Sequence, residues 1–162
     1  MMPEPWVPDQ LEPGRDGLTM VGQLGQSLDG QIATSTGQSK YINGKGGLAH
    51  LHALRAWADV VVVGVNTVVA DDPQLTVRLA QGPNPARVVI DPTARVPINA
   101  NCLQPDSGRA PPRVVLTASG VAPRAWPAGV KQQAIEGDRH LAPAQIRAWL
   151  GQQGWRRVLL EG

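Results

Sequence analysis

The chain has 162 residues, a formal net charge of +2 and one cysteine, Cys102, so it is long enough for one domain, has no internal disulfide and fits a reducing compartment. Lysines and arginines are scattered singly apart from Arg156-Arg157, which excludes the basic stripe of a nucleic-acid-binding protein. No apolar run approaches the roughly 18 residues of a membrane helix, and the proline-rich N-terminus does not look like a signal peptide, so we expect a cytoplasmic protein without a membrane partner.

The N-terminal third begins with an arm and then turns into regular structure. Residues 1–17 contain four prolines and no periodic apolar pattern, which predicts a poorly ordered arm before a domain over residues 18–162. A first strand is expected over 18–24, and the pair Asp29-Gly30 predicts a tight turn after it.

A helix over about 46–58, which Asn43 could cap, carries leucines at the three-to-four spacing of an amphipathic face. Arg55 lies at the margin of that apolar face, where its guanidinium should reach a carboxylate, a phosphate or solvent. An interfacial salt bridge and a ligand contact are both open at this point. His50 and His52 fall on different sides of the helix without a third ligand, so no metal site is predicted.

Four consecutive valines over 60–63 predict a strand that is buried on both faces of a sheet. Gly64 then allows a tight turn, and Asn66 and Thr67 are suitable N-caps for a helix. Asp71 and Asp72 follow, but adjacent side chains on such a backbone point apart, so we expect the two carboxylates to have different roles. The stretch is thus a plausible ligand-binding edge.

The remaining chain alternates strands with a helix. Strands are expected over 87–91, 113–117 and 157–160, and a helix begins near Pro143. This alternation predicts an α/β fold with an at least partly parallel sheet. The sequence contains no GxGxxG fingerprint, P-loop lysine motif, nucleophile elbow or internal repeat.

Five segments in order, at compatible spacing, resemble one protein family: 27–30, 37–42, 52–56, 63–68 and 71–78. The family is the reductase domain of the bacterial bifunctional riboflavin-biosynthesis deaminase-reductase, a relative of dihydrofolate reductase. The resemblance continues to Gly162 and covers nearly everything after the arm. It implies a dihydrofolate-reductase-like α/β fold, in which helices flank a central, mostly parallel mixed sheet.

The resemblance also implies an activity. The family uses NADPH to reduce 5-amino-6-(5-phosphoribosylamino)uracil to 5-amino-6-(5-phosphoribitylamino)uracil, with hydride transfer to C1′ of the ribose. The matching positions imply cofactor contacts from Gly25, Tyr41, Thr67 and Asp71, where Tyr41 replaces the usual Trp, and substrate contacts from Ser39, Arg55, Leu75, Arg78 and Glu161. Two of the latter are arginines, which suit a ribose phosphate. No protein group is assigned the chemical step, Asp72 is left with a structural role, and relatives of this fold imply a homodimer.

The chain departs from the family pattern at several points. Gln23 stands where the family often has lysine, and Pro92 stands where serine is common. From this sequence we expect no zinc deaminase domain before the reductase domain. We also expect the family's late strands and glycine-rich cofactor turn to be missing, because the sequence ends at Gly162. The departures keep two alternatives open: a stand-alone relative with a different pterin- or pyrimidine-like substrate, and a non-catalytic nucleotide-binding domain of the same fold.

Overall fold

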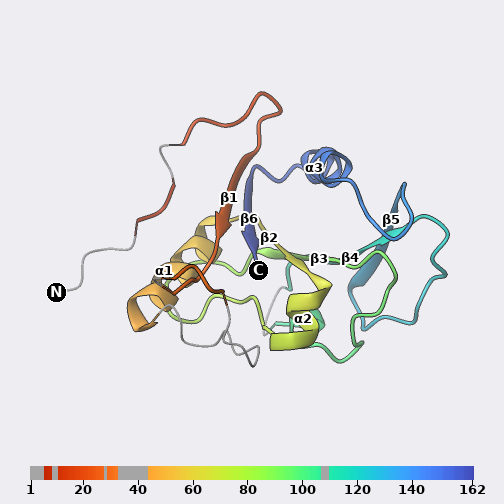
Figure 1. Ribbon diagram of the computed structural model, residues 1–162, viewed down its shortest axis with the longest axis horizontal. Coiled ribbons are helices and arrows are strands. Elements are labelled where there is room, and N and C mark those ends of the chain that lie inside the picture. The colour runs from red at the N-terminus through yellow and green to blue at the C-terminus, as the bar shows by residue number, and fades with distance from the viewer. Residues whose placement is uncertain (1–5, 9–10, 28, 33–43, 107–109) are drawn as a thin grey trace.

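The computed structural model describes residues 6–8, 11–27, 29–32, 44–106 and 110–162, whose arrangement is shown in Figure 1. In this part of the chain six strands form one sheet, in the order β1-β6-β2-β3-β4-β5, and every neighbouring pair is parallel. The strands are β1 (Thr19–Gln23), β2 (Val60–Gly64), β3 (Ala86–Ile90), β4 (Arg113–Ala118), β5 (Val130–Ile135) and β6 (Arg157–Glu161). The helices are α1 (Gly44–Trp57), α2 (Val65–Asp71) and α3 (Pro143–Gln152), with a 3-10 turn, η1, at Asn101–Leu103. The predicted α/β fold is confirmed.

Successive side chains of the central strands enter two separate hydrophobic cores, because side chains alternate between the faces of a sheet. Val61 and Val63 of β2 pack with α1, α2 and η1 on one face. Val60 and Val62 pack with α3 on the other, so the helices lie on opposite sides of the sheet (Figure 1). Full burial of such a side chain stabilises the fold by roughly 1.5–3 kcal/mol. The valine run is therefore the centre of a three-layer structure, as predicted.

Two details differ from the sequence-based expectation. The helix after β2 begins at Val65, with Gly64 as its N-cap and no side-chain capping bond, so the prediction that Asn66 or Thr67 caps it is wrong. Gly64 can enter the helix directly from its extended conformation, which leaves the two polar residues inside the first turn. Strand β5 was not predicted, because three consecutive polar residues, Lys131, Gln132 and Gln133, interrupt its apolar pattern; in the structure its residues are half-buried or exposed.

Described residues of the N-terminal arm contact both α1 and α3 of the domain. The backbone oxygen of Trp6 lies 2.8 Å from Nε2 of His50 on α1, and Asp16 forms an ion pair of 2.6 Å with Arg147 on α3. The predicted turn is present, since the amide of Gly30 donates to the carbonyl of Ser27 over 2.9 Å. Asn43, the expected cap of α1, lies outside the described residues. The division into an arm and a domain stays a prediction.

The helices of the described residues include none that is long and apolar enough to span a membrane. Cys102 is fully buried in η1, and this burial raises the pKa of its thiol to about 11. The thiol is therefore protonated near neutral pH, as expected for a cysteine that fills space in a core.

Candidate functional site

The site is built at the carboxyl end of the parallel sheet, where ligands bind in open α/β folds. Glu161 ends β6, and its register neighbours are Gln23 at the end of β1 and Val63 near the end of β2. The loop over residues 72–78 leaves α2 and passes beside this edge, because Arg55 bonds to both Glu161 and the carbonyl of Thr76. Sequence positions more than one hundred residues apart are thereby brought to one place.

Arg55 joins helix α1 to the end of β6. Its Nε and Nη2 donate to the two carboxylate oxygens of Glu161, each over 2.7 Å, and its Nη1 donates to the carbonyl of Thr76 over 3.2 Å. The two ionised side chains are only 6% and 9% exposed. The alternative of an interfacial salt bridge is therefore realised, while a direct contact of Arg55 with substrate stays a prediction.

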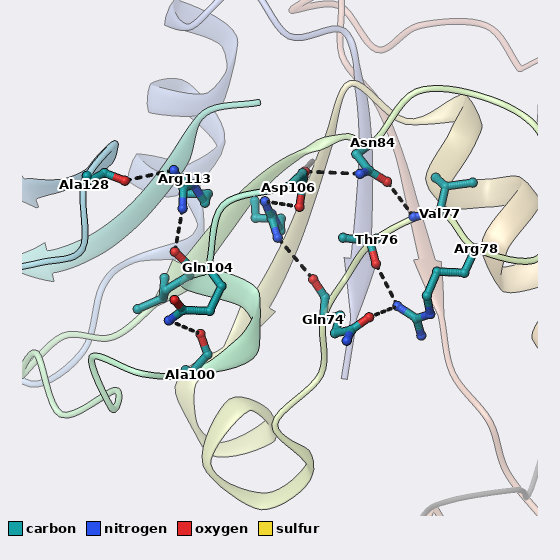
Figure 2. A network of polar contacts seen from close by, with 12 residues as sticks. Gln74, Thr76, Val77, Arg78, Asn84, Ala100, Gln104, Asp106, Arg113 and Ala128 are labelled. Carbon is teal, nitrogen blue, oxygen red and sulfur yellow. Dashed lines mark hydrogen bonds and ion pairs between the residues drawn. The ribbon is translucent and has the colours of Figure 1, made fainter. Parts of the chain in front are cut away.

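Arg78 presents an exposed cationic side chain beside this ion pair. Its Nη1 donates to Oε1 of Gln74 over 2.8 Å and to Oγ1 of Thr76 over 2.7 Å (Figure 2). Partial burial and the nearby charge of Arg55 lower the pKa of Arg78, whereas the charge of Glu161 opposes that shift. Arg55, Arg78 and Glu161 thus form one electrostatic cluster, hereafter the arginine cluster, in which Arg78 is the exposed member.

Leu75 lies in the same loop but turns its side chain inward. It is 1% exposed and belongs to the core that α1 and α2 cover. Its φ of 58° is in the left-handed region, which is uncommon for a bulky residue and costs free energy unless neighbouring contacts enforce it. Any contact of Leu75 with a ligand is therefore left to its backbone.

The residues proposed to bind the cofactor lie at the same end of the sheet, as far as they are described. Thr67 and Asp71 are four residues apart, so they share one face of α2, and both are half-buried. Gly25 is half-buried and lies two residues after the end of β1. Ser39 and Tyr41 fall outside the described residues. Their roles, like those of the other predicted contacts, stay predictions.

Asp72 has the structural role that was expected for it. Its Oδ1 accepts the amide of Asn101 and its Oδ2 accepts Nδ2 of Asn101, each over 2.8 Å, so it fastens the end of α2 to η1. Its φ of 42° is left-handed, a conformation that aspartate tolerates better than alanine.

Asp72→Ala is therefore expected to lower the free energy of unfolding by about 1–2 kcal/mol. Urea unfolding measures this loss. Asp72→Asn keeps one acceptor and the tolerance for positive φ, so its loss in the free energy of unfolding should be less than half of the loss in Asp72→Ala. An unchanged midpoint for Asp72→Ala would show that the carboxylate does not fasten η1 to the helix.

Sequence reasoning missed two polar residues that hold the 72–78 loop. His52, for which no metal site is predicted and no other role is assigned, accepts the amide of Arg78 at Nδ1 over 2.9 Å. Asn84 accepts the amide of Val77 at Oδ1 over 2.7 Å. A polar residue on the buried face of a predicted helix is a signal for His52, but no local signal marks Asn84. In the described ranges no group of His, Cys, Asp and Glu side chains could hold a metal ion.

His52 makes stability depend on pH. Burial, followed by the charges of Arg55 and Arg78, lowers the pKa of His52 from 6.5 to about 4. Between these values the unfolded chain binds a proton at His52 that the folded chain does not. The contribution of His52 to the free energy of unfolding is therefore fully present above pH 6.5 and is lost as the pH drops toward 4.

We expect the free energy of unfolding to fall by about 2 kcal/mol more between pH 7 and pH 5 in the wild type than in His52→Asn. Urea titrations of both proteins at the two pH values give this difference. The carboxylates titrate in both proteins, so their contribution cancels when the two are compared. Equal pH dependence in the two proteins would contradict a neutral, buried His52.

Comparison with known proteins gives the relationship. The sequence model of the RibD C-terminal domain matches residues 19–162. The chain belongs to the RibD C-terminal domain family. The 2,5-diamino-6-ribosylamino-4(3H)-pyrimidinone 5′-phosphate reductase of Methanothermobacter thermautotrophicus is 39% identical over 142 residues, which cover 84% of this chain and 63% of that protein. The Archaeoglobus fulgidus protein of the same name is 33% identical over 149 residues, which cover 84% of this chain and 66% of that protein.

Two solved structures agree with the fold. The deaminase and 5-amino-6-(5-phosphoribosylamino)uracil reductase of Thermotoga maritima superposes with a TM-score of 0.72 at 28% identity, over 90% of this chain and 39% of that one. The Saccharomyces cerevisiae reductase Rib7 reaches a TM-score of 0.69 at 18% identity, over 94% of this chain and 66% of that one, which supports the fold alone. The present chain spans 63% of the Methanothermobacter relative and 25% of Aquifex aeolicus RibD.

Proposed function

We propose that this RibD-type domain reduces a ribosylaminopyrimidine 5′-phosphate with NADPH, converting 5-amino-6-(5-phosphoribosylamino)uracil to 5-amino-6-(5-phosphoribitylamino)uracil. The observation that supports the proposal most is the arginine cluster at the carboxyl end of the sheet. It offers a cationic, partly desolvated surface that suits the phosphate of such a substrate. Relatives that share the family domain carry the names of reductases for ribosylaminopyrimidine phosphates.

Binding and alignment are the work of the protein in this proposal. Arg78 holds the 5′-phosphate, because its side chain is exposed and already oriented by Gln74 and Thr76. Arg55 and Glu161 keep the loop that carries Arg78 against the sheet. With the phosphate held there, C1′ of the sugar would stay at a fixed place relative to a bound cofactor, which lowers the barrier because less orientational entropy is lost during the reaction. The proposed substrate contacts of Ser39 and of the Leu75 backbone complete the site.

The described residues fit a nicotinamide cofactor on the α2 side of the site. A Cβ added at Gly64 would meet nothing within 4 Å, so the end of β2 leaves room for a close approach. The hydroxyl of Thr67 and the carboxylate of Asp71 share the adjacent face of α2 and offer polar contacts to a ribose. We propose that these two residues, with Gly25 and Tyr41, hold NADPH, which supplies the hydride when bound.

A second substrate is favoured by a specific finding. The two archaeal relatives are named as reductases of 2,5-diamino-6-ribosylamino-4(3H)-pyrimidinone 5′-phosphate, which bears an amino group where the uracil compound bears oxygen. Both compounds share the ribose phosphate that the arginine cluster would bind. The ratio of kcat/KM for the two pyrimidines decides between them, and a preference for the diamino compound would place this chain with the archaeal proteins.

Turnover tests the proposal directly. The full chain is incubated with NADPH and the uracil substrate, NADPH oxidation is followed by absorbance, and the product is identified by mass spectrometry. We expect a product that has gained two hydrogens, faster reaction with NADPH than with NADH, and a large loss of kcat/KM for the dephosphorylated substrate. NADPH binding without turnover of either pyrimidine would favour the non-catalytic alternative instead. A homodimer is proposed as well, and sedimentation equilibrium measures it.

A further inference from the structure

Every backbone hydrogen bond described for the segment 74–78 is made with a side chain from another part of the chain. The carbonyls of Gln74 and Thr76 accept from Arg87 over 3.4 Å and from Arg55 over 3.2 Å. The two following amides, those of Val77 and Arg78, donate to Asn84 over 2.7 Å and to His52 over 2.9 Å. The conformation of this segment therefore depends on four side chains outside it.

The segment needs this support because it is strained. Leu75 has a left-handed φ of 58° although its side chain is bulky, and such a residue persists only where its surroundings enforce it. The carbonyls held by Arg87 and Arg55 flank Leu75 directly in sequence. The amides held by Asn84 and His52 lie next along the chain and end at Arg78 itself. The backbone that carries the Arg78 guanidinium is thus fixed immediately before its side chain begins.

A charged network orients the Asn84 side chain. Its Nδ2 donates to Oδ2 of Asp106 over 3.1 Å, and Oδ1 of Asp106 accepts Nη2 of Arg87 over 2.9 Å. An ionised carboxylate accepts hydrogen bonds but cannot donate them. The Asn84 amide must therefore place Nδ2 toward Asp106 and Oδ1 toward Val77 (Figure 2). Arg87 is 1% exposed and the side chain of Asp106 is 9% exposed, so their ion pair is largely shielded from water.

His52 is fixed as an acceptor by its surroundings. It is 3% exposed, and its Nδ1 receives the Arg78 amide, which requires that nitrogen to be unprotonated. Burial and the charges of Arg55 from its own helix and Arg78 from the loop disfavour a positive imidazole, and they outweigh the backbone of Thr76, which favours it. Neither His52 nor Asn84 makes a described contact with the guanidinium of Arg78, so both act on it through the backbone.

We propose that His52 and Asn84 are positioning residues that fix the Arg78 guanidinium for the substrate phosphate through hydrogen bonds to the amides of Arg78 and Val77, with Asp106 orienting Asn84. This inference rests on the proposed function, because it assigns Arg78 to the phosphate. It extends the site to Asp106, a residue beyond η1 that no local motif connects with the substrate loop.

The test compares variants that remove an acceptor with variants that keep one. His52→Leu and Asn84→Leu remove the acceptor. His52→Asn keeps an oxygen near the place of Nδ1. The double variant Asn84→Asp with Asp106→Asn exchanges carboxylate and amide, so an acceptor still faces the amide of Val77. Calorimetry with ribose 5-phosphate should show about tenfold weaker binding for each leucine variant and less than threefold weaker binding for the variants that keep an acceptor. NADPH affinity, measured on the same samples, should stay within twofold and shows that each variant is folded.

Two further arms show whether the effect passes through Arg78. In an Arg78→Ala background the leucine substitutions should no longer change ribose 5-phosphate binding, because the group they position is absent. Hydrogen exchange should be faster at the amides of Val77 in Asn84→Leu and Arg78 in His52→Leu. Unchanged ribose 5-phosphate affinity in the leucine variants, or an equal loss in the Arg78→Ala background, overturns the positioning role.

The wild type separates this inference from the function on which it rests. If the wild type neither binds ribose 5-phosphate nor reduces either pyrimidine, the proposed function fails and the positioning role fails with it. If the wild type reduces the substrate while the leucine variants keep its KM, only the positioning role fails.

Discussion

Replacing Arg78 with alanine is expected to raise the KM for the phosphorylated pyrimidine about 100-fold, because a charge-assisted contact with phosphate contributes about 1.5–3 kcal/mol. The guanidinium is exposed and held by Gln74 and Thr76, so its loss removes a ready-made cation without emptying a core position. The dissociation constant for NADPH should change less than twofold. Steady-state kinetics with the phosphorylated and dephosphorylated substrates measure the effect, which should be confined to the phosphorylated compound.

Arg139→Ala is the matched control for Arg78→Ala. Arg139 is also an exposed arginine, and it lies in the connection between β5 and α3, outside the arginine cluster. Its removal changes the net charge by the same amount, so it reports any general effect of charge on an anionic substrate. An equal rise in KM for both variants, or no rise for Arg78→Ala, would contradict the assignment of Arg78 to the phosphate.

Replacing Glu161 with alanine is expected to lower the free energy of unfolding by about 3–5 kcal/mol, because it leaves the guanidinium of Arg55 charged and without its partner at a buried position. The carboxylate of Glu161 accepts two hydrogen bonds from Arg55, which in turn holds the carbonyl of Thr76. The substrate loop should therefore loosen as the helix and strand lose their connection. Urea unfolding of the variant and the wild type measures the difference.

Two companion variants test the cause of that loss. Glu136→Ala removes an exposed carboxylate directly after β5 and should change stability by less than about 0.5 kcal/mol. The double variant Arg55→Met with Glu161→Met removes both charges and should recover most of the stability, since a buried pair can often be replaced by apolar residues. A double variant as unstable as Glu161→Ala would show that the lost charge balance is not the cause.

The sequence was sufficient for most of the sheet and for one part of the site. The valines of β2 are apolar on both faces, which is a local property, and the alternation of strands with helices defines the fold class. Arg55 was singled out because a guanidinium at the edge of an apolar face requires a partner, and the structure supplies Glu161. The resemblance to the family connected Arg78 and Glu161, which lie far apart in the chain.

Other features depend on contacts that no local pattern encodes. Strand β5 is polar in its middle and forms because β4 offers it a partner along six residues. Asn84 and Asp106 hold the substrate loop across 22 residues of sequence, and Asp106 has no distinguishing neighbours in the chain. His52 was examined as a possible metal ligand, whereas its role follows from the amide of Arg78. Such pairings become visible only once the chain is folded.

Deuterium transfer from NADPH labelled at nicotinamide C4 measures most directly whether this chain reduces its proposed substrate. The labelled cofactor is incubated with the full chain and 5-amino-6-(5-phosphoribosylamino)uracil, and the product is analysed by mass spectrometry and NMR. Direct hydride transfer predicts one deuterium at C1′ of the ribityl chain when the transferred position of the cofactor carries the label. Product without deuterium from either labelled face of the cofactor, or no product from this substrate and its 2-amino counterpart, would contradict the proposed reduction.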